Sequence, residues 1–189
     1  MAQKLDLIPY YLISGIDKNK LSIEGIPEEY ASVVLGDEPF YMDGVERMLP
    51  EYRFGYMYDR FSYYDSVYCP MDMDGDGVKE ILICNADQGD TLLLSIADGR
   101  VNGKEFIFKN MLKKFNDGTF SFTYNAALLG RGRLERDGAD WKTVELTREE
   151  TSGEGDPTYF VNGVEATKEE YDKAEEGYGY TPAEFKSFI

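Results

Sequence analysis

A short acidic segment, DMDGDGVKE, concentrates oxygen ligands at a spacing that suits a metal ion. It places Asp72, Asp74 and Asp76 at alternate positions. Calcium takes roughly six to eight oxygen ligands, and a tight loop can supply them when alternate side chains point inward. We therefore expect a structural calcium ion here. Its expected ligands are the side chains of Asp72, Asp74, Asp76 and Glu80 and the main-chain carbonyl of Val78.

The residues between these acids support a tight loop. Gly75 and Gly77 permit backbone angles that larger residues resist. Without a metal, carboxylates this close in sequence repel each other, and the nearest cation along the chain is Lys79. The alternative is an acidic turn that only closes a hairpin. Magnesium fits less well than calcium, because it prefers a rigid octahedral site and keeps its waters.

The loop differs from an EF-hand, which needs an acidic ligand at its twelfth position. That position is Ile83, inside the apolar run ILIC. The segment instead resembles the shorter Dx[DN]GDGxx[DE] loop of integrin-type propeller repeats and, in related form, of dockerins. The resemblance implies the same five ligands, with Glu80 standing where those repeats often carry aspartate.

Two further segments extend the resemblance: GIPEEYASVVLGDEPFY near the start and YFVNGVEATKEEYDKAEE near the end. Together with the loop they resemble uncharacterised exported proteins and lipoproteins of gut-type clostridia. In those proteins a DxDGDGxxEL-like loop precedes an antiparallel sheet, and an NGxxxxxxEY helix closes the domain. The segments cover well under half of the chain, and only the loop carries a specific motif. The resemblance implies a secreted or cell-surface module and no particular reaction.

Charge and composition exclude several classes of function. The formal charge is −16, from 36 acidic and 20 basic residues. Such a surface repels phosphates and anionic lipid, so we expect no direct binding of nucleic acid, whereas a basic protein partner is compatible with it. The chain has no histidine, which removes Ser-His-Asp and Cys-His catalysis and histidine-ligated zinc.

The two cysteines, Cys69 and Cys84, flank the acidic loop. They are too few for a four-thiolate metal site or for a scaffold built on disulfides. In a hairpin around the loop they would lie on adjacent strands, where a disulfide could form in an oxidising compartment. Two buried free thiols are the alternative, and the strand register decides between them.

The elements that would position the loop are strands with helices at both ends of the chain. Pro27 and the acids after it predict a helix over about 27–35, and residues 43–50 would add one turn. Tyr52, Phe54, Tyr56 and Tyr58 alternate, which favours a strand. Further strands are expected at 62–69, 79–85, 91–97, 104–109, 119–124, 130–136, 141–148 and 158–161.

The end of the chain predicts a hairpin and two short helices. Asn162-Gly163 would turn the hairpin, and Thr167 with Glu170 forms a capping box for a helix to about residue 176. A second box at 181–184 predicts a short terminal helix. The fold class is therefore α+β, an antiparallel, aromatic-rich sheet flanked by helices. We expect one domain over 1–189, with a helical segment to about 50, the sheet over 51–162 and helices over 167–189.

These features favour a calcium-stabilised extracellular or cell-surface module that binds a protein or glycan without catalysing a reaction. One alternative is an intracellular acidic inhibitor that mimics nucleic acid and blocks a basic groove. Another is a glycan-binding or glycan-hydrolysing protein that uses carboxylates, with the tyrosines of 52–68 as a sugar platform. The N-terminal segment is a poor signal peptide and no apolar run could span a membrane, so a cytoplasmic location stays open.

Overall fold

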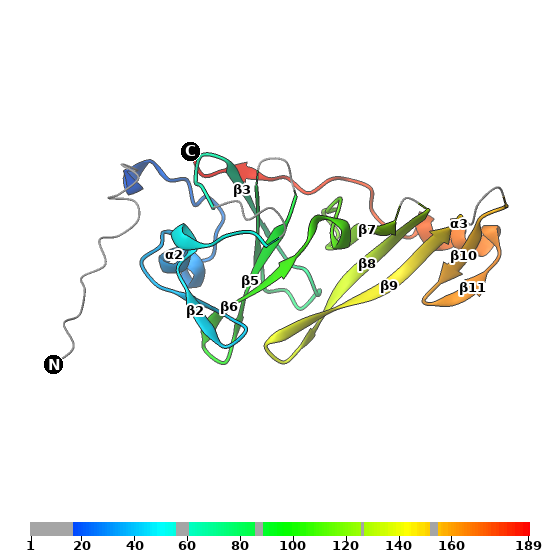
Figure 1. Cartoon of the computed structure of the whole chain (residues 1–189), viewed down its shortest axis with the longest axis horizontal. Helices are drawn as coiled ribbons and strands as arrows, with labels where there is room; N and C mark the ends of the chain where they lie inside the picture. Colours follow the sequence, from blue (N-terminus) through cyan, green and yellow to red (C-terminus); the bar gives the residue numbers. More distant parts are fainter. Residues whose placement is uncertain (1–16, 56–60, 86–88, 126, 152–154) are drawn as a thin grey trace.

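Two β-sheets form the framework of the protein (Figure 1). The computed structural model describes residues 17–55, 61–85, 89–125, 127–151 and 155–189. Within these residues the chain forms a seven-stranded sheet and a five-stranded sheet, so the α+β class with largely antiparallel strands is confirmed.

The seven-stranded sheet has the order β12-β3-β4-β5-β6-β1-β2. Its strands are β1 (Phe40–Met42), β2 (Val45–Arg47), β3 (Ser66–Met71), β4 (Glu80–Asn85), β5 (Thr91–Ala97), β6 (Arg100–Phe106) and β12 (Lys186–Ser187). Neighbouring strands are antiparallel, apart from one parallel contact in which Tyr41 of β1 lies opposite Asn102 of β6. The expected strands at 79–85 and 91–97 match β4 and β5 closely.

The five-stranded sheet has the order β11-β10-β9-β8-β7. Its strands are β7 (Phe120–Asn125), β8 (Leu128–Asp137), β9 (Asp140–Glu150), β10 (Thr158–Val161) and β11 (Val164–Ala166). The β8–β9 hairpin is long, and Figure 1 shows that one of its ends lies near the seven-stranded sheet while the other carries β10, β11 and α3 (Lys168–Glu176). The predicted helix after Thr167 and its capping box are confirmed.

Helix α2 (Glu28–Val34) follows Pro27 and has two acids in its first turn, where their negative charge interacts favourably with the helix dipole. It buries Tyr30, Val33 and Val34 in the core on one face of the seven-stranded sheet. Short 3₁₀ helices lie at η1 (Lys18–Lys20), η2 (Leu49–Glu51) and η3 (Phe108–Asn110). The expected helix at 27–35 is thus confirmed within about one residue at each end.

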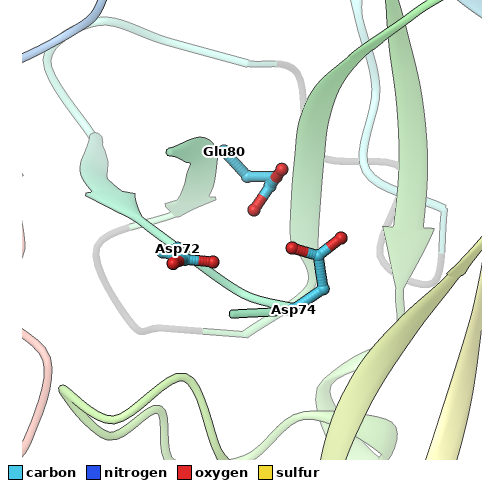
Figure 2. A group of neighbouring side chains, drawn as sticks. All are labelled: Asp72, Asp74 and Glu80. Atoms are coloured by element: carbon cyan, nitrogen blue, oxygen red, sulfur yellow. The ribbon is translucent and has the colours of Figure 1, made fainter. Parts of the chain in front are cut away.

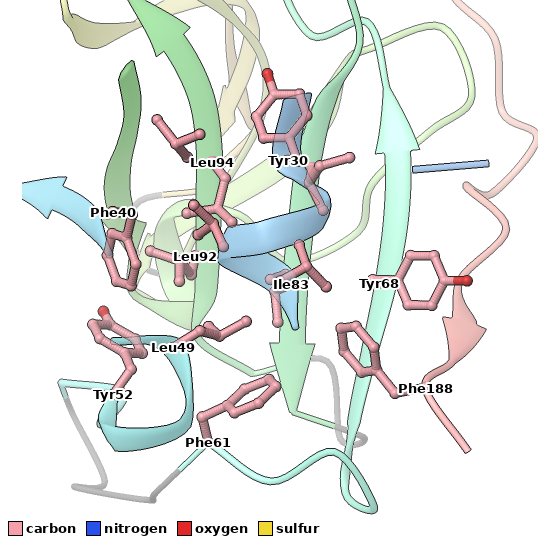
Figure 3. Close-up of a cluster of buried hydrophobic side chains, with 14 of the residues drawn as sticks. Tyr30, Phe40, Leu49, Tyr52, Phe61, Tyr68, Ile83, Leu92, Leu94 and Phe188 are labelled. Atoms are coloured by element: carbon pink, nitrogen blue, oxygen red, sulfur yellow. The ribbon is translucent and has the colours of Figure 1, made fainter. Parts of the chain in front are cut away.

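The first core is rich in aromatic rings that meet edge to face (Figure 3). Phe61 lies 4.7 Å from Tyr63 and 5.8 Å from Phe188, measured between ring centroids. Such pairs contribute about 0.5–1.5 kcal/mol each beyond the burial of their area. Because Phe188 is fully buried here, it anchors β12 beside β3.

A second core lies on the other face of the same strands and joins the two sheets. Leu82 and Leu93 come from β4 and β5, while Leu134 and Trp141 come from β8 and β9. Since side chains alternate along a strand, Leu82 faces this core and its neighbours Ile81 and Ile83 face the first one.

Three local predictions were wrong. The expected helical turn over 43–50 is instead the strand β2 followed by η2, because Asp43 and Gly44 take positive φ and turn a hairpin. The strand expected from Tyr52 does not form over 52–55, and residues 56–60 lie outside the described part of the chain. The terminal helix after Thr181 is replaced by extended chain, in which Pro182 pairs with Phe115 and β12 pairs with β3.

Candidate metal centre

The acidic loop closes the hairpin between β3 and β4. The last paired residues of the hairpin are Met71 and Glu80, so the loop between them is held by a regular antiparallel ladder. Asp72 and Glu80 therefore begin and end the segment with their backbones close together. This register is what brings acids from both ends of the loop into one place.

Three of the predicted ligands form a group. Asp72, Asp74 and Glu80 each offer a carboxylate oxygen, and these atoms all lie within 4.8 Å of one another. Figure 2 shows the three carboxylates turned toward a common space. Two oxygens on opposite sides of a calcium ion, each about 2.4 Å from it, are about 4.8 Å apart. The three carboxylates are therefore close enough together to hold a metal ion.

Main-chain N–H groups of the loop hold the Asp72 carboxylate. Gly75 N donates to its Oδ1 at 2.7 Å and Gly77 N donates to its Oδ2 at 2.9 Å. Both glycines have positive φ, +80° and +87°, which residues with a Cβ adopt only at a cost. The glycines therefore position Asp72 as well as turning the chain.

The structure does not bring all five predicted ligands together. The side chain of Asp76 accepts a hydrogen bond from Val78 N at 2.7 Å and does not belong to the group of three. The side chain of Val78 is half exposed, which agrees with a contribution through its main chain alone. Asp76 and the Val78 carbonyl stay predicted ligands.

Glu80 is the buried member of the group. Glu80 has no exposed surface, and its Oε2 accepts a hydrogen bond from Met73 N at 2.9 Å. The pKa of Glu80 is raised to about 7, mainly by burial and also by the neighbouring Asp74, against the lowering effects of Met73 N and Arg136. An anion buried in this way calls for a positive partner.

Arg136 of β8 supplies that partner from the other sheet. Its Nη2 lies 2.8 Å from Glu80 Oε1, and its Nε lies 3.3 Å from Asp74 Oδ2. Its Nη1 donates to the carbonyl of Ile96 at 2.7 Å, and the guanidinium lies 4.7 Å from the ring centroid of Trp141. The guanidinium thus joins the acidic group to β5 and β9.

Sequence reasoning missed Arg136, because the segment GRGRLER resembles a solvated strand with acids beside its arginines. The alternation of residues along the strand nevertheless indicates which face Arg136 lies on. Leu134 is buried in the core between the sheets, and the residue two positions further along a strand lies on the same face. Arg133 and Glu135 lie on the opposite face and pair with each other at 2.8 Å.

A second loop, 116–119, packs against the acidic loop. A Cβ placed on Gly118 would lie 2.8 Å from the carbonyl oxygen of Asp72, so the two backbones approach closely. Beside this contact is a hollow of about 440 Å³, whose lining includes Asp74, Asp117 and Tyr178. The acidic group is therefore open to solvent on one side and backed by β4 on the other.

The cysteines lie on the same face of adjacent strands but are not paired directly. Cys69 is opposite Leu82 and Cys84 is opposite Val67, and both are buried free thiols. The Sγ of Cys84 lies 3.3 Å from Oγ1 of Thr91. Burial raises the pKa of the Cys69 thiol to about 11, which disfavours the reactive thiolate.

Five of the described aromatic residues in the predicted sugar platform face the core, whereas Tyr64 is exposed. Tyr52, Phe54, Phe61, Tyr63 and Tyr68 are all buried. Because these five side chains are buried, they do not present a stacking surface for a sugar.

Comparisons with protein-family models, with curated proteins and with solved structures find no match for this chain. In the described part of the chain, no helix combines the length and apolar character needed to cross a membrane.

Proposed function

We propose that the protein is a calcium-stabilised binding or interaction module that works outside the cell or at its surface, with a structural and non-catalytic metal. The observation that carries this proposal is the group of Asp72, Asp74 and Glu80, whose ligand atoms lie within 4.8 Å of one another. The remaining ligands would be Asp76, the Val78 carbonyl and water.

The donor set supports calcium over other metals. All the donors are oxygens, which hard cations such as calcium and magnesium prefer. The loop contains two glycines and side chains of different length, so its ligand positions can adapt. Calcium accepts such variable geometry, whereas magnesium demands a near-ideal octahedron.

The place of the group in the fold supports a stabilising role. The loop joins β3 to β4, so an ion bound to it would hold the ends of these two strands together. An ion that binds the folded chain alone stabilises it by about 2.7 kcal/mol when its free concentration is 100 times the dissociation constant. For a chain of this length that corresponds to roughly 5–10 °C in melting temperature.

Calcium binding to the purified protein tests the proposal. Titration calorimetry after treatment with a chelator should show one site that prefers calcium to magnesium, and Asp72→Asn should weaken it at least tenfold. Asp98→Asn, which changes an exposed acid in the β5–β6 turn, is the matched control and should bind as the wild type does. The proposal fails if millimolar calcium neither binds nor raises the melting temperature.

The affinity also tests the proposed location. Extracellular modules bind calcium with dissociation constants of about 10⁻⁴–10⁻³ M, whereas intracellular sensors bind at about 10⁻⁷–10⁻⁵ M. A value in the first range supports a surface or secreted protein. We propose that the partner is a protein or glycan, and the charge of −16 favours a basic protein.

A further inference from the structure

We infer that Arg136 is the built-in counter-ion of the acidic group and that a divalent cation must displace its guanidinium from Asp74 and Glu80 in order to bind. This inference rests on the proposed function, since it concerns the same site. It makes Arg136 the residue that sets the affinity of the site and its preference for divalent over monovalent cations.

The hydrogen bonds of the two carboxylates carry the argument. One oxygen of each carboxylate accepts a hydrogen bond from a main-chain N–H. Asp74 Oδ1 accepts from Asp76 N at 3.2 Å, and Glu80 Oε2 accepts from Met73 N at 2.9 Å. The other oxygen of each carboxylate accepts a hydrogen bond from Arg136. The main-chain bonds are built into the loop, so the bonds to Arg136 are those that an incoming cation replaces.

Electrostatics prevents the two cations from sharing these oxygens. Glu80 has no exposed surface and Arg136 keeps only about a quarter of its side chain exposed. Two positive charges a few ångströms apart in such a site repel each other by several kcal/mol, even with an effective dielectric constant of about 20. A monovalent ion would replace one positive charge by another and gain little, whereas a divalent ion gains charge.

The displaced guanidinium would change the surroundings of Trp141. This is the only tryptophan in the chain, it is 5% exposed, and Arg136 lies 4.7 Å from its ring centroid. Its Nε1 is fixed by a hydrogen bond to Ser95 Oγ at 3.0 Å, so the ring can stay in place while the charge on its face moves. Trp141 fluorescence therefore reports the position of Arg136.

The test combines calcium titration with Trp141 emission for three variants. Arg136→Met removes the competitor and should bind calcium at least tenfold more tightly than the wild type. Arg136→Lys keeps the charge but loses the forked geometry, so its affinity should fall between the two. Arg47→Met removes the same charge from an exposed position on β2, the edge strand of the seven-stranded sheet, and should bind as the wild type does. Circular dichroism checks that each variant is folded, and Arg136→Lys carries the test if Arg136→Met does not fold.

The fluorescence gives an independent result. Calcium should change the intensity or wavelength of Trp141 emission in the wild type and in Arg47→Met, and should leave it unchanged in Arg136→Met. If the wild type binds calcium while its emission stays constant and the Arg136 variants bind no more tightly, the inference is overturned and the proposed function stands. If neither the wild type nor any Arg136 variant binds calcium, the proposed function itself fails.

Discussion

Arg136 Nη2 lies 2.8 Å from Glu80 Oε1, although the two residues belong to different sheets. Glu80 is at the start of β4 and Arg136 is near the end of β8. Because the glutamate is fully buried, the contact neutralises a charge that water cannot reach. It therefore links the loop, the edge of the core and the second sheet through one side chain.

Loss of this contact should destabilise the ion-free protein. In the presence of a chelator, Arg136→Met would leave Glu80 buried without its partner, and we expect a loss of about 3 kcal/mol in the free energy of unfolding. Arg133→Met breaks an exposed pair with Glu135 and should cost less than about 1 kcal/mol. Urea denaturation measures both, and equal losses in the two variants would contradict the importance of the buried pair.

The close approach of the two loops should make Gly118 intolerant of a side chain. Gly118→Ala combines a positive φ of +80° with a Cβ that would lie 2.8 Å from Asp72 O. Gly138→Ala is the matched control, because Gly138 also has positive φ but has open space around it. We expect the control to lose about 1–2 kcal/mol and Gly118→Ala to lose more. Only Gly118→Ala should weaken calcium binding, since it shifts Asp72.

The capping box of α3 should contribute measurably to the helix. Thr167 Oγ1 accepts from Glu170 N at 3.2 Å, and Thr167 N donates to Glu170 Oε2 at 2.8 Å. Thr167→Ala should cost about 1 kcal/mol and speed amide exchange within 168–176. Thr181→Ala alters the predicted box that starts no helix, and a similar loss there would contradict this explanation.

The thiols should be free and slow to react. In unreduced protein unfolded by guanidinium, both cysteines should titrate with an aromatic disulfide reagent. In the folded protein at pH 8 they should react far more slowly, because both are buried and the pKa of Cys69 is raised to about 11. Fewer than two thiols in the unfolded sample would instead show a disulfide.

Asp117 should contribute stability that is lost in acid. Burial raises its pKa, but hydrogen bonds from Thr119 and from Gly179 N lower it more, so its pKa lies below the ordinary value of 3.8. A lowered pKa in the folded state stabilises the protein above pH 3.8, and this contribution disappears as the pH falls through the folded-state pKa.

The advantage of the wild type over Asp117→Asn should therefore be constant near neutral pH and shrink below about pH 4. Urea denaturation at a series of pH values measures this difference, with Asp98→Asn as an exposed control. If the stability advantage of the wild type over Asp117→Asn instead increased as the pH fell, the pKa of Asp117 could not be lowered in the folded protein.

The sequence was most informative where local chemistry decides the structure. Asn162 and Gly163 both take positive φ in the β10–β11 turn, because glycine lacks a Cβ and asparagine tolerates this region better than most residues. Thr167 and Glu170 form their capping box from residues of one turn. The three carboxylates of the acidic group also come from one short segment, and each accepts a hydrogen bond from a main-chain N–H of that segment.

Prediction failed where distant parts of the chain compete with local preference. The box at Thr181 has the same form as that at Thr167, but pairing of Pro182 with Phe115 and of β12 with β3 keeps this segment extended. Arg136 reaches the acidic group only because the β8–β9 hairpin packs on the first sheet. Neither contact has a signature within a short window of sequence.

The position of β12 has a consequence for synthesis of the chain. Strand β3 lies between β4 and residues 186–187, and Phe188 fills the first core beside Tyr68. Until those residues have left the ribosome, β3 has an unpaired edge and the core beside it lacks a large ring. The seven-stranded sheet therefore stays incomplete while its central strands are being translated. The long-range pairing of β12 with β3 should make folding slow, and the edge of β3 should need protection until then.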